Sequence, residues 1–327
     1  MYNPKNILLT GCCGFIGSNL LNYLVKKYSK INFYNIDRLD YCSNLNNIDV
    51  KDYNNYKFFK GDISQSDFIL HILNEYNIDT VIHMAAQSHV DNSFGNSIKF
   101  TKDNILATHI LLECCKNYNK IKRFIHVSTD EVYGEVEFNA PDCDEKYLLN
   151  PTNPYAASKA GVEFLVKSYY LSFNLPIIIT RGNNVFGPKQ YPEKLIPKFI
   201  LSLKNNEKCT IHGDGSSRRN FIFVDDVCSA FEKIIFKGKI NEIYNIGTNN
   251  EYSVMEITKL LINKIKNDNS FEKYIEFVPD RNFNDKRYAI SSEKLEKLGW
   301  KEECIFDTSL DKTIQWYTNN INHWKLN

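Results

Sequence analysis

The stretch "TGCCGFIGS", Thr10–Ser18, decides the fold of this chain. It comes after an apolar, strand-like run at Asn6–Thr10 and leads into a helical pattern of apolar residues at Phe15–Tyr28. Three glycines, spaced three residues apart, fill the connection. A glycine-rich strand–helix connection can be no more than a tight turn, so its meaning depends on the residues further along the chain.

Each glycine has a role that a dinucleotide phosphate loop requires. Gly11 permits a tight turn, Gly14 lets a pyrophosphate approach backbone N–H groups, and Gly17 lets the helix pack closely on the strand. The N-terminus of the helix then favours the anion. The loop residues that we expect to contact a cofactor are Gly11, Gly14, Phe15, Ile16 and Gly17.

An acidic residue at the end of the second strand-like run supports this interpretation. Asp37 lies about twenty residues beyond the loop, where an acid hydrogen-bonds the ribose hydroxyls of a dinucleotide. A carboxylate there repels a 2′-phosphate, which predicts NAD rather than NADP, although the neighbouring Arg38 could weaken this preference. The alternative is a simple turn acid. Further residues expected near the cofactor are Asp62, Ile63, Ala85 and Ala86.

Strand and helix patterns alternate through the first half of the chain. The expected strands are Asn6–Thr10, Ile31–Asp37, Tyr56–Asp62, Thr80–Ala86, Arg123–Thr129 and Pro176–Gly182. The expected helices between them are Phe15–Tyr28, Ser66–Tyr76, Ser97–Tyr118 and Asn153–Phe173. Near-continuous apolar strands separated by helices predict an α/β fold with a Rossmann-type, doubly wound parallel sheet.

This alternation ends after Gly187-Pro188, where the elements become shorter. The expected strands are Cys209–Gly213, Asn220–Val224, Ile243–Gly247 and Tyr274–Val278, and the expected helices are Ser253–Lys266 and Asp307–Thr318. We therefore expect an NAD-binding domain at 1–182, to which elements near 220–247 return. Residues 183–327 then form most of a smaller α/β lid domain that binds the substrate.

The bulk composition excludes several function classes. A net charge of +1, with 43% hydrophobic and 24% charged residues, gives no reason to expect nucleic acid or a membrane surface as a partner. The chain starts without a signal-peptide pattern, and its nine cysteines show no CxxC spacing. We therefore expect a cytoplasmic protein with free thiols and no metal site.

Two ionisable side chains in "YAASK" lie four residues apart on an expected helix. Tyr155 and Lys159 therefore share one helix face. An ammonium close to a phenol lowers the pKa of the phenol, which can then take a proton from an alcohol while a hydride leaves. Taken alone, the pair can equally be an exposed helix pair.

The stretch "STDEVYG", Ser128–Gly134, places two adjacent acids, Asp130 and Glu131, directly behind the hydroxyl of Thr129. Two neighbouring carboxyls with separated pKa values can serve as an acid and a base on adjacent carbons. Neighbouring strand residues point to opposite faces, so both can reach one ligand only if the chain leaves strand geometry near Thr129. We expect that break; the alternative is an acidic turn.

These motifs together resemble one family nearly from end to end. They are "TGCCGFIGS", "NIDRLDYCSNL", "AAQSHVDNS", "STDEVYG", "NPYAASK", "RGNNVFGP", "YPEKLIPKFI", "IHGDGSSRRNF", "YNIG" and "DRNFNDKRYAI". The chain is similar to the nucleotide-sugar 4,6-dehydratases of the extended short-chain dehydrogenase/reductase superfamily. That family includes the dTDP-glucose enzymes and the UDP-glucose 4,6-dehydratase domain of rhamnose synthases.

The resemblance implies oxidation, elimination and reduction on one bound sugar. Tyr155, helped by Lys159 and Thr129, takes the C4 hydroxyl proton while NAD takes the hydride. Glu131 removes the C5 proton, and protonated Asp130 donates to the C6 hydroxyl, which leaves as water. The hydride then returns to C6, and C5 is reprotonated.

The resemblance also implies how a nucleotide sugar is held. Its diphosphate contacts are Arg219 and Arg281, and its other substrate contacts are Ser88, Thr129, Asn184, Lys194, Leu195 and Asn284. Val185, Asn284 and Asp103 depart from residues usual in the bacterial dTDP-glucose enzymes, so the choice between uracil and thymine stays open. A homodimer is implied by the family.

Two other functions compete with this interpretation. A 4-epimerase of the same fold needs no acid–base pair, and the adjacent acids Asp130 and Glu131 speak against it. A catalytically silent NAD(H)-binding module needs no intact Thr129, Tyr155 and Lys159.

Overall fold

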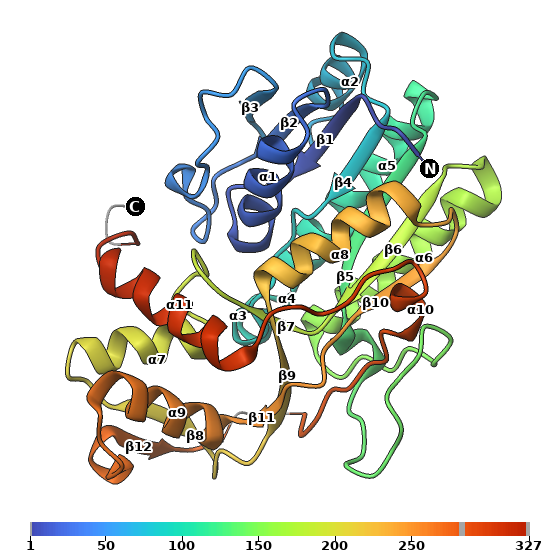
Figure 1. Ribbon diagram of the computed structural model, residues 1–327. Helices are drawn as coiled ribbons and strands as arrows, with labels where there is room; N and C mark the ends of the chain where they lie inside the picture. Colours follow the sequence, from blue (N-terminus) through green and yellow to red (C-terminus); the bar gives the residue numbers. More distant parts are fainter. Residues whose placement is uncertain (1, 281–284, 325–327) are drawn as a thin grey trace.

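The computed structural model describes residues 2–280 and 285–324, and its centre is a seven-stranded parallel sheet (Figure 1). The strand order is β10-β6-β5-β4-β1-β2-β3. The strands are β1 (Asn6–Thr10), β2 (Asn32–Asp37), β3 (Tyr56–Lys60), β4 (Thr80–His83), β5 (Arg123–Thr129), β6 (Ile177–Gly182) and β10 (Ile243–Ile246). The order reverses between β1 and β4, which confirms the doubly wound α/β fold.

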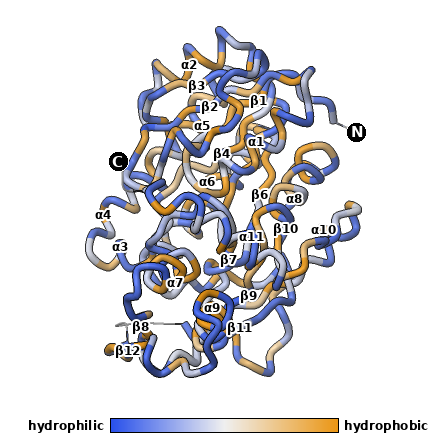
Figure 2. The backbone as a smooth tube through the Cα atoms, turned by 60° about the vertical axis from the view of Figure 1, so that its left-hand side comes forward, coloured by the Kyte–Doolittle hydropathy of each residue, from blue (hydrophilic) through white to orange (hydrophobic). Residues whose placement is uncertain are grey.

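Helices cover both faces of this sheet. One face carries α1 (Phe15–Lys27) and α8 (Val224–Lys237), and the other carries α2 (Ser66–Glu75), α5 (Ala107–Tyr118) and α6 (Pro154–Phe173). Along β1, Ile7 and Leu9 pack on the first face and Leu8 on the second. Both faces of the sheet are therefore apolar. In the backbone tube of Figure 2, many of the hydrophobic (orange) segments lie in the interior of the molecule.

The expected long helix over 97–118 is interrupted. It begins as α4 (Ser97–Phe100), continues through the π-helical turn η2 (Thr101–Leu106) and ends as α5. Ahead of it lies the short helix α3 (Val90–Gly95). Such π-helical turns occur often at functional sites, and η2 places polar side chains near the end of β4.

The second half of the chain forms two small sheets and their helices. A three-stranded sheet contains β7 (Asn184–Phe186), β9 (Arg218–Phe223) and β11 (Glu251–Ser253), and a two-stranded sheet pairs β8 (Cys209–His212) with β12 (Ile275–Val278). The helices are α7 (Leu195–Lys204), α9 (Val254–Lys266), α10 (Glu293–Glu296) and α11 (Phe306–Asn319), and the remaining short turns are η1 (Leu45–Asn47), η3 (Asp130–Tyr133) and η4 (Phe271–Tyr274). Helices α7 and α8 were not expected from the sequence. The return of β10 to the large sheet agrees with the expected return near 220–247, while the domain division at 182 stays a prediction.

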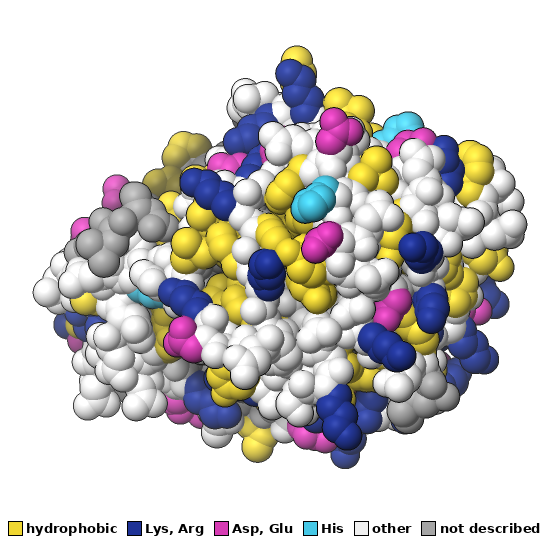
Figure 3. All heavy atoms as spheres, turned by 90° about the horizontal axis from the view of Figure 1, so that it is seen from above, with side chains coloured by type: hydrophobic (Ala, Val, Ile, Leu, Met, Phe, Trp, Pro, Cys, Tyr) yellow, Lys and Arg dark blue, Asp and Glu magenta, His cyan; other side chains and the backbone are white. Residues whose placement is uncertain are grey.

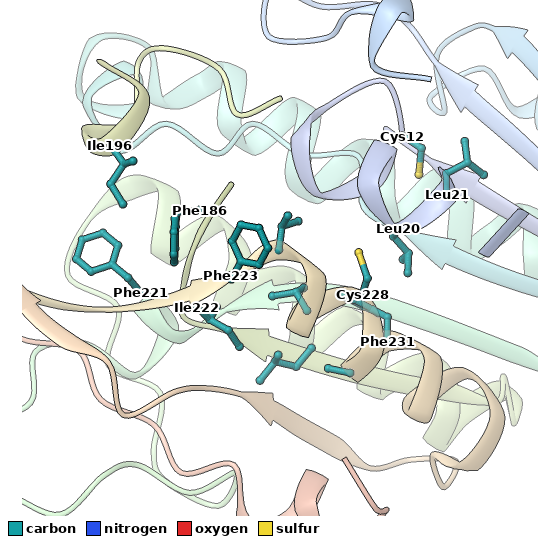
Figure 4. Close-up of a cluster of buried hydrophobic side chains, with 14 of the residues drawn as sticks. Cys12, Leu20, Leu21, Phe186, Ile196, Phe221, Ile222, Phe223, Cys228 and Phe231 are labelled. Atoms are coloured by element: carbon teal, nitrogen blue, oxygen red, sulfur yellow. The ribbon is translucent and has the colours of Figure 1, made fainter. Parts of the chain in front are cut away.

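An apolar cluster joins the small sheets to the large one (Figure 4). Phe186 of β7 and Phe223 of β9 are buried, and their rings lie 5.4 Å apart. Leu20 of α1 and Phe231 of α8 belong to the same continuous core. This shared core fixes the lid elements against the carboxyl ends of the large sheet.

A buried ion pair holds α6 against the sheet. Arg181 of β6 and Glu163 of α6 are each 1% exposed, and their Nη2 and Oε2 atoms lie 2.6 Å apart. Arg181 Nη1 also donates to the hydroxyl of Tyr133 in η3 at 2.7 Å. Removing one partner of such a pair leaves an uncompensated buried charge, so the pair fixes α6 relative to η3.

Candidate active site

A cavity of about 500 Å³ opens at the carboxyl ends of the large sheet and is also lined by residues of the lid elements. This is the edge at which open α/β sheets bind ligands. Its walls include the following expected site residues: Gly11, Gly14, Phe15, Ile16, Gly17, Asp37, Asp62, Ile63, Ala85, Ala86, Ser88, Thr129, Glu131, Tyr155, Lys159, Asn184, Lys194, Leu195 and Arg219. Expected residues Arg281 and Asn284 lie outside the described residues, and Asp130 is treated below.

The glycine loop fits a dinucleotide. Gly11 has a φ of +73°, and a Cβ on it would lie 2.6 Å from the Ala85 Cα. A Cβ on Gly17 would lie 2.7 Å from the Cys12 Cα. Gly14 caps α1 without a side-chain hydrogen bond, and its Cβ would approach only the Gly11 carbonyl oxygen, at 3.3 Å. The loop backbone and the first amides of α1 therefore face the cavity, ready to receive phosphates.

Asp37 links the loop to the expected ribose site. Its carboxylate is 5% exposed and accepts hydrogen bonds from the Cys13 amide at 2.9 Å and the Leu39 amide at 2.8 Å. Burial raises the pKa of Asp37, and the two amides oppose that shift. The side chain both orders the loop and lines the cavity.

The chain leaves strand geometry directly after Thr129, as expected. β5 ends at Thr129, and η3 begins at Asp130. The Thr129 hydroxyl accepts from the Glu131 amide at 3.3 Å and so caps the turn. Glu131 thereby turns into the cavity, where its Oε2 accepts a hydrogen bond from Asn153 Nδ2 at 3.2 Å.

Asp130 lies behind the cavity wall. It is 2% exposed, its Oδ2 accepts from Asn183 Nδ2 at 2.7 Å, and its Oδ1 accepts from the Thr129 hydroxyl at 3.2 Å. Both partners line the cavity, but Asp130 does not. Direct access to the cavity is therefore found for Glu131 alone, because two hydrogen bonds hold the Asp130 carboxyl one side chain away.

The electrostatics of the pair favour a shared proton. Burial, followed by repulsion from Glu131, raises the pKa of Asp130 to about 7. Burial also raises the pKa of Glu131, while its bond to Asn153 and the charges of Lys194 and Arg219 oppose that shift. At neutral pH the pair can therefore hold one proton between two carboxyls.

Tyr155 and Lys159 share a face of α6, whose first turn is capped by Asn153. Lys159 Nζ donates to the Val127 carbonyl at 2.5 Å, and burial lowers the pKa of Lys159 to about 8. Burial and the Glu131 carboxylate raise the pKa of Tyr155, although the Thr129 hydroxyl opposes them. The expected lowering of the Tyr155 pKa by Lys159 is therefore wrong for this structure: the ammonium is bound to the Val127 carbonyl, and burial raises the pKa of the phenol.

Cations from the lid complete the site. Lys194 Nζ donates to the Ser88 carbonyl at 2.8 Å, which links the segment before α7 to the loop after β4. The Arg219 guanidinium lies over the Tyr288 ring, 4.7 Å from its centroid. These cations can meet an anionic substrate group at the lid side of the cavity.

Sequence reasoning missed three polar side chains of the site, two of which hold the reactive acids. Asn183 and Asn153, which bind the two acids, lie inside the motifs "RGNNVFGP" and "NPYAASK". Asp285 is 3% exposed, lines the cavity and accepts from Thr152 at 2.7 Å. The two asparagines could have been found as neighbours of chosen motif residues, whereas nothing in the sequence links Asp285 to Thr152.

Neither a metal centre nor a membrane span emerges from residues 2–280 and 285–324. No group of three or more His, Cys, Asp or Glu side chains in this part of the chain is placed to hold a metal ion. None of its helices is long and apolar enough to cross a membrane. On the face viewed in Figure 3, positive and negative side chains are interspersed.

Comparisons with known proteins agree with this geometry. The family model described as GDP-mannose 4,6 dehydratase matches residues 8–313. A dTDP-D-glucose 4,6-dehydratase of Dictyostelium discoideum is 49% identical over 98% of this chain and 83% of its own length. A trifunctional UDP-glucose 4,6-dehydratase, epimerase and reductase of Arabidopsis thaliana is 50% identical over 99% of this chain, which spans only 48% of the plant protein.

A solved structure shares the whole fold. The dTDP-glucose 4,6-dehydratase DesIV of Streptomyces venezuelae, crystallised with NAD and TYD bound, is 34% identical and superposes with a TM-score of 0.92. The match covers 98% of this chain and 99% of that chain. This chain belongs to the nucleotide-sugar 4,6-dehydratase family of the extended short-chain dehydrogenases/reductases.

Proposed function

We propose that this protein is an NAD-dependent nucleotide-sugar 4,6-dehydratase. It converts UDP-glucose or dTDP-glucose to the corresponding 4-keto-6-deoxy sugar nucleotide and water. The observation that carries the proposal is the pair of adjacent acids at the end of β5, of which Asp130 is buried and Glu131 faces the cavity, and both raise the pKa of Tyr155. Relatives named as dTDP- and UDP-glucose 4,6-dehydratases support the same activity.

The cofactor would lie along the glycine loop, between Asp37 and the Ala85–Ala86 segment, all of which line the cavity. NAD, when bound, supplies a hydride acceptor for C4 and later the hydride donor for C6. The protein moves the protons. The Tyr155 phenolate, which the Thr129 hydroxyl stabilises, accepts the proton of the C4 hydroxyl and becomes a neutral phenol. Since burial raises the pKa of Tyr155, the phenol must first lose its own proton in the loaded site. Lys159 holds the end of β5 through the Val127 carbonyl.

The acid pair performs the elimination. A ketone at C4 makes the C5 proton acidic, and Glu131 takes that proton as the general base. Asp130 gives its proton to the C6 hydroxyl, whose C–O bond breaks as water leaves. The electron pair released at C5 forms the C5–C6 double bond, so atoms and charge balance. One carboxyl must be ionised and the other protonated at the same moment, which the separated environments of the two side chains allow.

Asp130 must reach the sugar from behind the wall. A rotation of its side chain would break the bonds to Asn183 and Thr129 and bring the carboxyl into the cavity. We propose that substrate binding drives this rotation. Thr129 contacts Asp130 through its hydroxyl and also lines the cavity, so the Asp130 carboxyl would pass beside Thr129 as it enters the cavity.

The substrate diphosphate would meet Arg219 and Lys194 at the lid side of the cavity. An arginine can bind phosphate oxygens through two parallel N–H groups, and the Tyr288 ring holds the Arg219 guanidinium in place. Uracil and thymine differ by one methyl group, so both nucleotides are tested as substrates.

The activity itself is tested by mass spectrometry after incubation with UDP-glucose and, separately, with dTDP-glucose. We expect at least one sugar nucleotide to lose the mass of one water. A product of unchanged mass with galactose stereochemistry would identify a 4-epimerase instead. If neither substrate changes while NAD still binds, the chain is a binding module and the proposal is wrong.

Two isosteric variants separate the roles of the acids. Glu131→Gln removes the general base, so deuterium exchange at C5 of a bound 4-keto sugar should slow by at least about 100-fold. Asp130→Asn keeps the base but removes the acid, so C4 oxidation should persist while water loss slows by about 100-fold. Bound NADH should then accumulate, which is measured by its absorbance. The two variants are matched controls for each other. Equal effects of both on the oxidation step would refute this division of labour.

We further propose that two copies of the chain pair through the outer face of α6 and its neighbour η2. Large apolar side chains are exposed there: Leu106 (53%), Phe164 (62%) and Leu171 (76%). Phe164 and Leu171 lie two helical turns apart on one face of α6. A second copy would cover this apolar surface, as is usual for symmetric dimers.

The dimer is tested with Phe164→Glu/Leu171→Glu, which places charges on the proposed interface. Light scattering after gel filtration should change from the mass of two chains to that of one. Phe277→Glu, on a side chain that is 56% exposed on β12, should leave the mass unchanged. Wild-type protein that is already monomeric at micromolar concentration would contradict this proposal.

We also place the protein in the cytoplasm. All nine cysteines are free, and seven of them are buried, as is common in a reducing compartment.

A further inference from the structure

The surroundings of Arg38 concern the choice between two dinucleotides. Arg38 comes directly after Asp37, the expected ribose ligand at the end of β2. In dinucleotide-binding folds, an arginine near this position accommodates the 2′-phosphate of NADP. Whether Arg38 can do so depends on which groups its guanidinium already binds.

Three carboxylates occupy that guanidinium. Asp103 binds it with both oxygens, at 3.1 Å from Nη1 and 2.5 Å from Nη2. Asp40 Oδ2 lies 2.7 Å from Nη2, and Asp62 Oδ2 lies 3.2 Å from Nη1. The acids come from three places in the fold: the segment after β2, the segment after β3, and η2.

Two amide side chains hold these acids in turn. Gln87 Nε2 donates to Asp40 Oδ2 at 2.9 Å and to Asp103 Oδ2 at 3.0 Å. Asn104 fixes Gln87, because its Oδ1 accepts from the Gln87 amide at 2.7 Å and its Nδ2 donates to the Gln87 carbonyl at 3.1 Å. The pairing of Arg38 is therefore built into the π-helical turn and the loop after β4.

The local charge is negative. Arg38 and the three acids line the cavity, with Asp37 beside them. Four carboxylates there face one guanidinium, and the nearest further cation in the described chain that pairs with this set is Lys99, 3.5 Å from Asp40. The Tyr41 amide and Arg38 overcome the effect of burial and lower the pKa of Asp40 to about 2, so this acid stays ionised. A 2′-phosphate placed here would meet repulsion rather than an available arginine.

We propose that Asp103 and Asp40 are specificity-determining residues that withhold Arg38 from a 2′-phosphate and so select NAD over NADP. The inference rests on the proposed binding of a dinucleotide along the glycine loop. It assigns a role to Asp103 in the choice of cofactor. Asp37 discriminates against NADP by repelling its 2′-phosphate. Asp103 and Asp40 add a second effect, because they occupy the Arg38 guanidinium that could otherwise bind this phosphate.

The test measures binding rather than turnover. Full-length protein freed of nucleotide is titrated with NAD⁺ and with NADP⁺ by calorimetry, in wild type and in Asp103→Asn. Asparagine keeps the shape but removes the carboxylate that binds both Arg38 Nη atoms, leaving one contact each from Asp40 and Asp62. The guanidinium then becomes available to a phosphate, so the Kd for NADP⁺ should fall by at least about tenfold, which is the value of one charge-assisted contact. The Kd for NAD⁺ should change by less than about threefold. Asp40→Asn should act in the same direction.

Two further variants identify the cause. Arg38→Gln in the Asp103→Asn background should abolish the gain in NADP⁺ affinity, because the released arginine is then missing. Asp52→Asn removes the same charge from an exposed site outside the cavity and should leave both Kd values unchanged.

The outcomes separate the proposals. An unchanged NADP⁺ affinity in folded Asp103→Asn and Asp40→Asn, or a gain that survives Arg38→Gln, would overturn the role of Arg38. If the variants change the ratio of the two Kd values only because NAD⁺ binds more weakly, the proposed role of Arg38 would be overturned as well. Because the readout is nucleotide affinity, dehydratase activity can fail in the earlier test while this result stands, and the reverse.

Discussion

Two adjacent carboxyl groups at the end of one strand, one buried and one at the cavity wall, form the constraint on which this site depends. Asp130 is 2% exposed, and its neighbour Glu131 faces the cavity beside it. Burial raises the pKa of both acids, and repulsion from Glu131 raises that of Asp130 further, which costs folding free energy whenever both are ionised. Such strain is worth keeping only where the chemistry needs an acid and a base side by side.

The fold supplies the geometry that the pair requires. The carboxyl ends of β1 and β5 meet at the same sheet edge, so the glycine loop and Thr129 line one cavity. The buried ion pair between Arg181 and Glu163 fixes α6, and with it Tyr155, against β6. Asn153 caps the same helix and binds Glu131, so one side chain positions both the phenol and the base.

The sequence predicts the parts of this site that depend on local pattern. The glycine loop and the break after Thr129 are each encoded by residues close together in the chain. Helix α8 escaped prediction because it begins directly after β9 without a loop, so no turn residues mark its start. Helix α7 has Pro197 in its first turn, and a proline within a short apolar run is typical of a helix end or a break. Contacts between distant elements were equally out of reach. Asp130 contacts Asn183 because β5 and β6 are neighbours in the sheet. Arg38, which follows β2, binds Asp103 of η2 at the carboxyl edge of the sheet.

The protonation of one of the two acids near neutral pH can be measured directly. Infrared difference spectra of wild type against Asp130→Asn, recorded from about pH 5 to about pH 9, isolate the carbonyl stretch of the Asp130 carboxylic acid. We expect a protonated-carboxyl band that is absent from the variant and disappears with a midpoint near pH 7, where burial places the Asp130 pKa. A difference spectrum that shows only ionised carboxylate throughout this range would refute the shared proton, and with it the role of Asp130 as the acid.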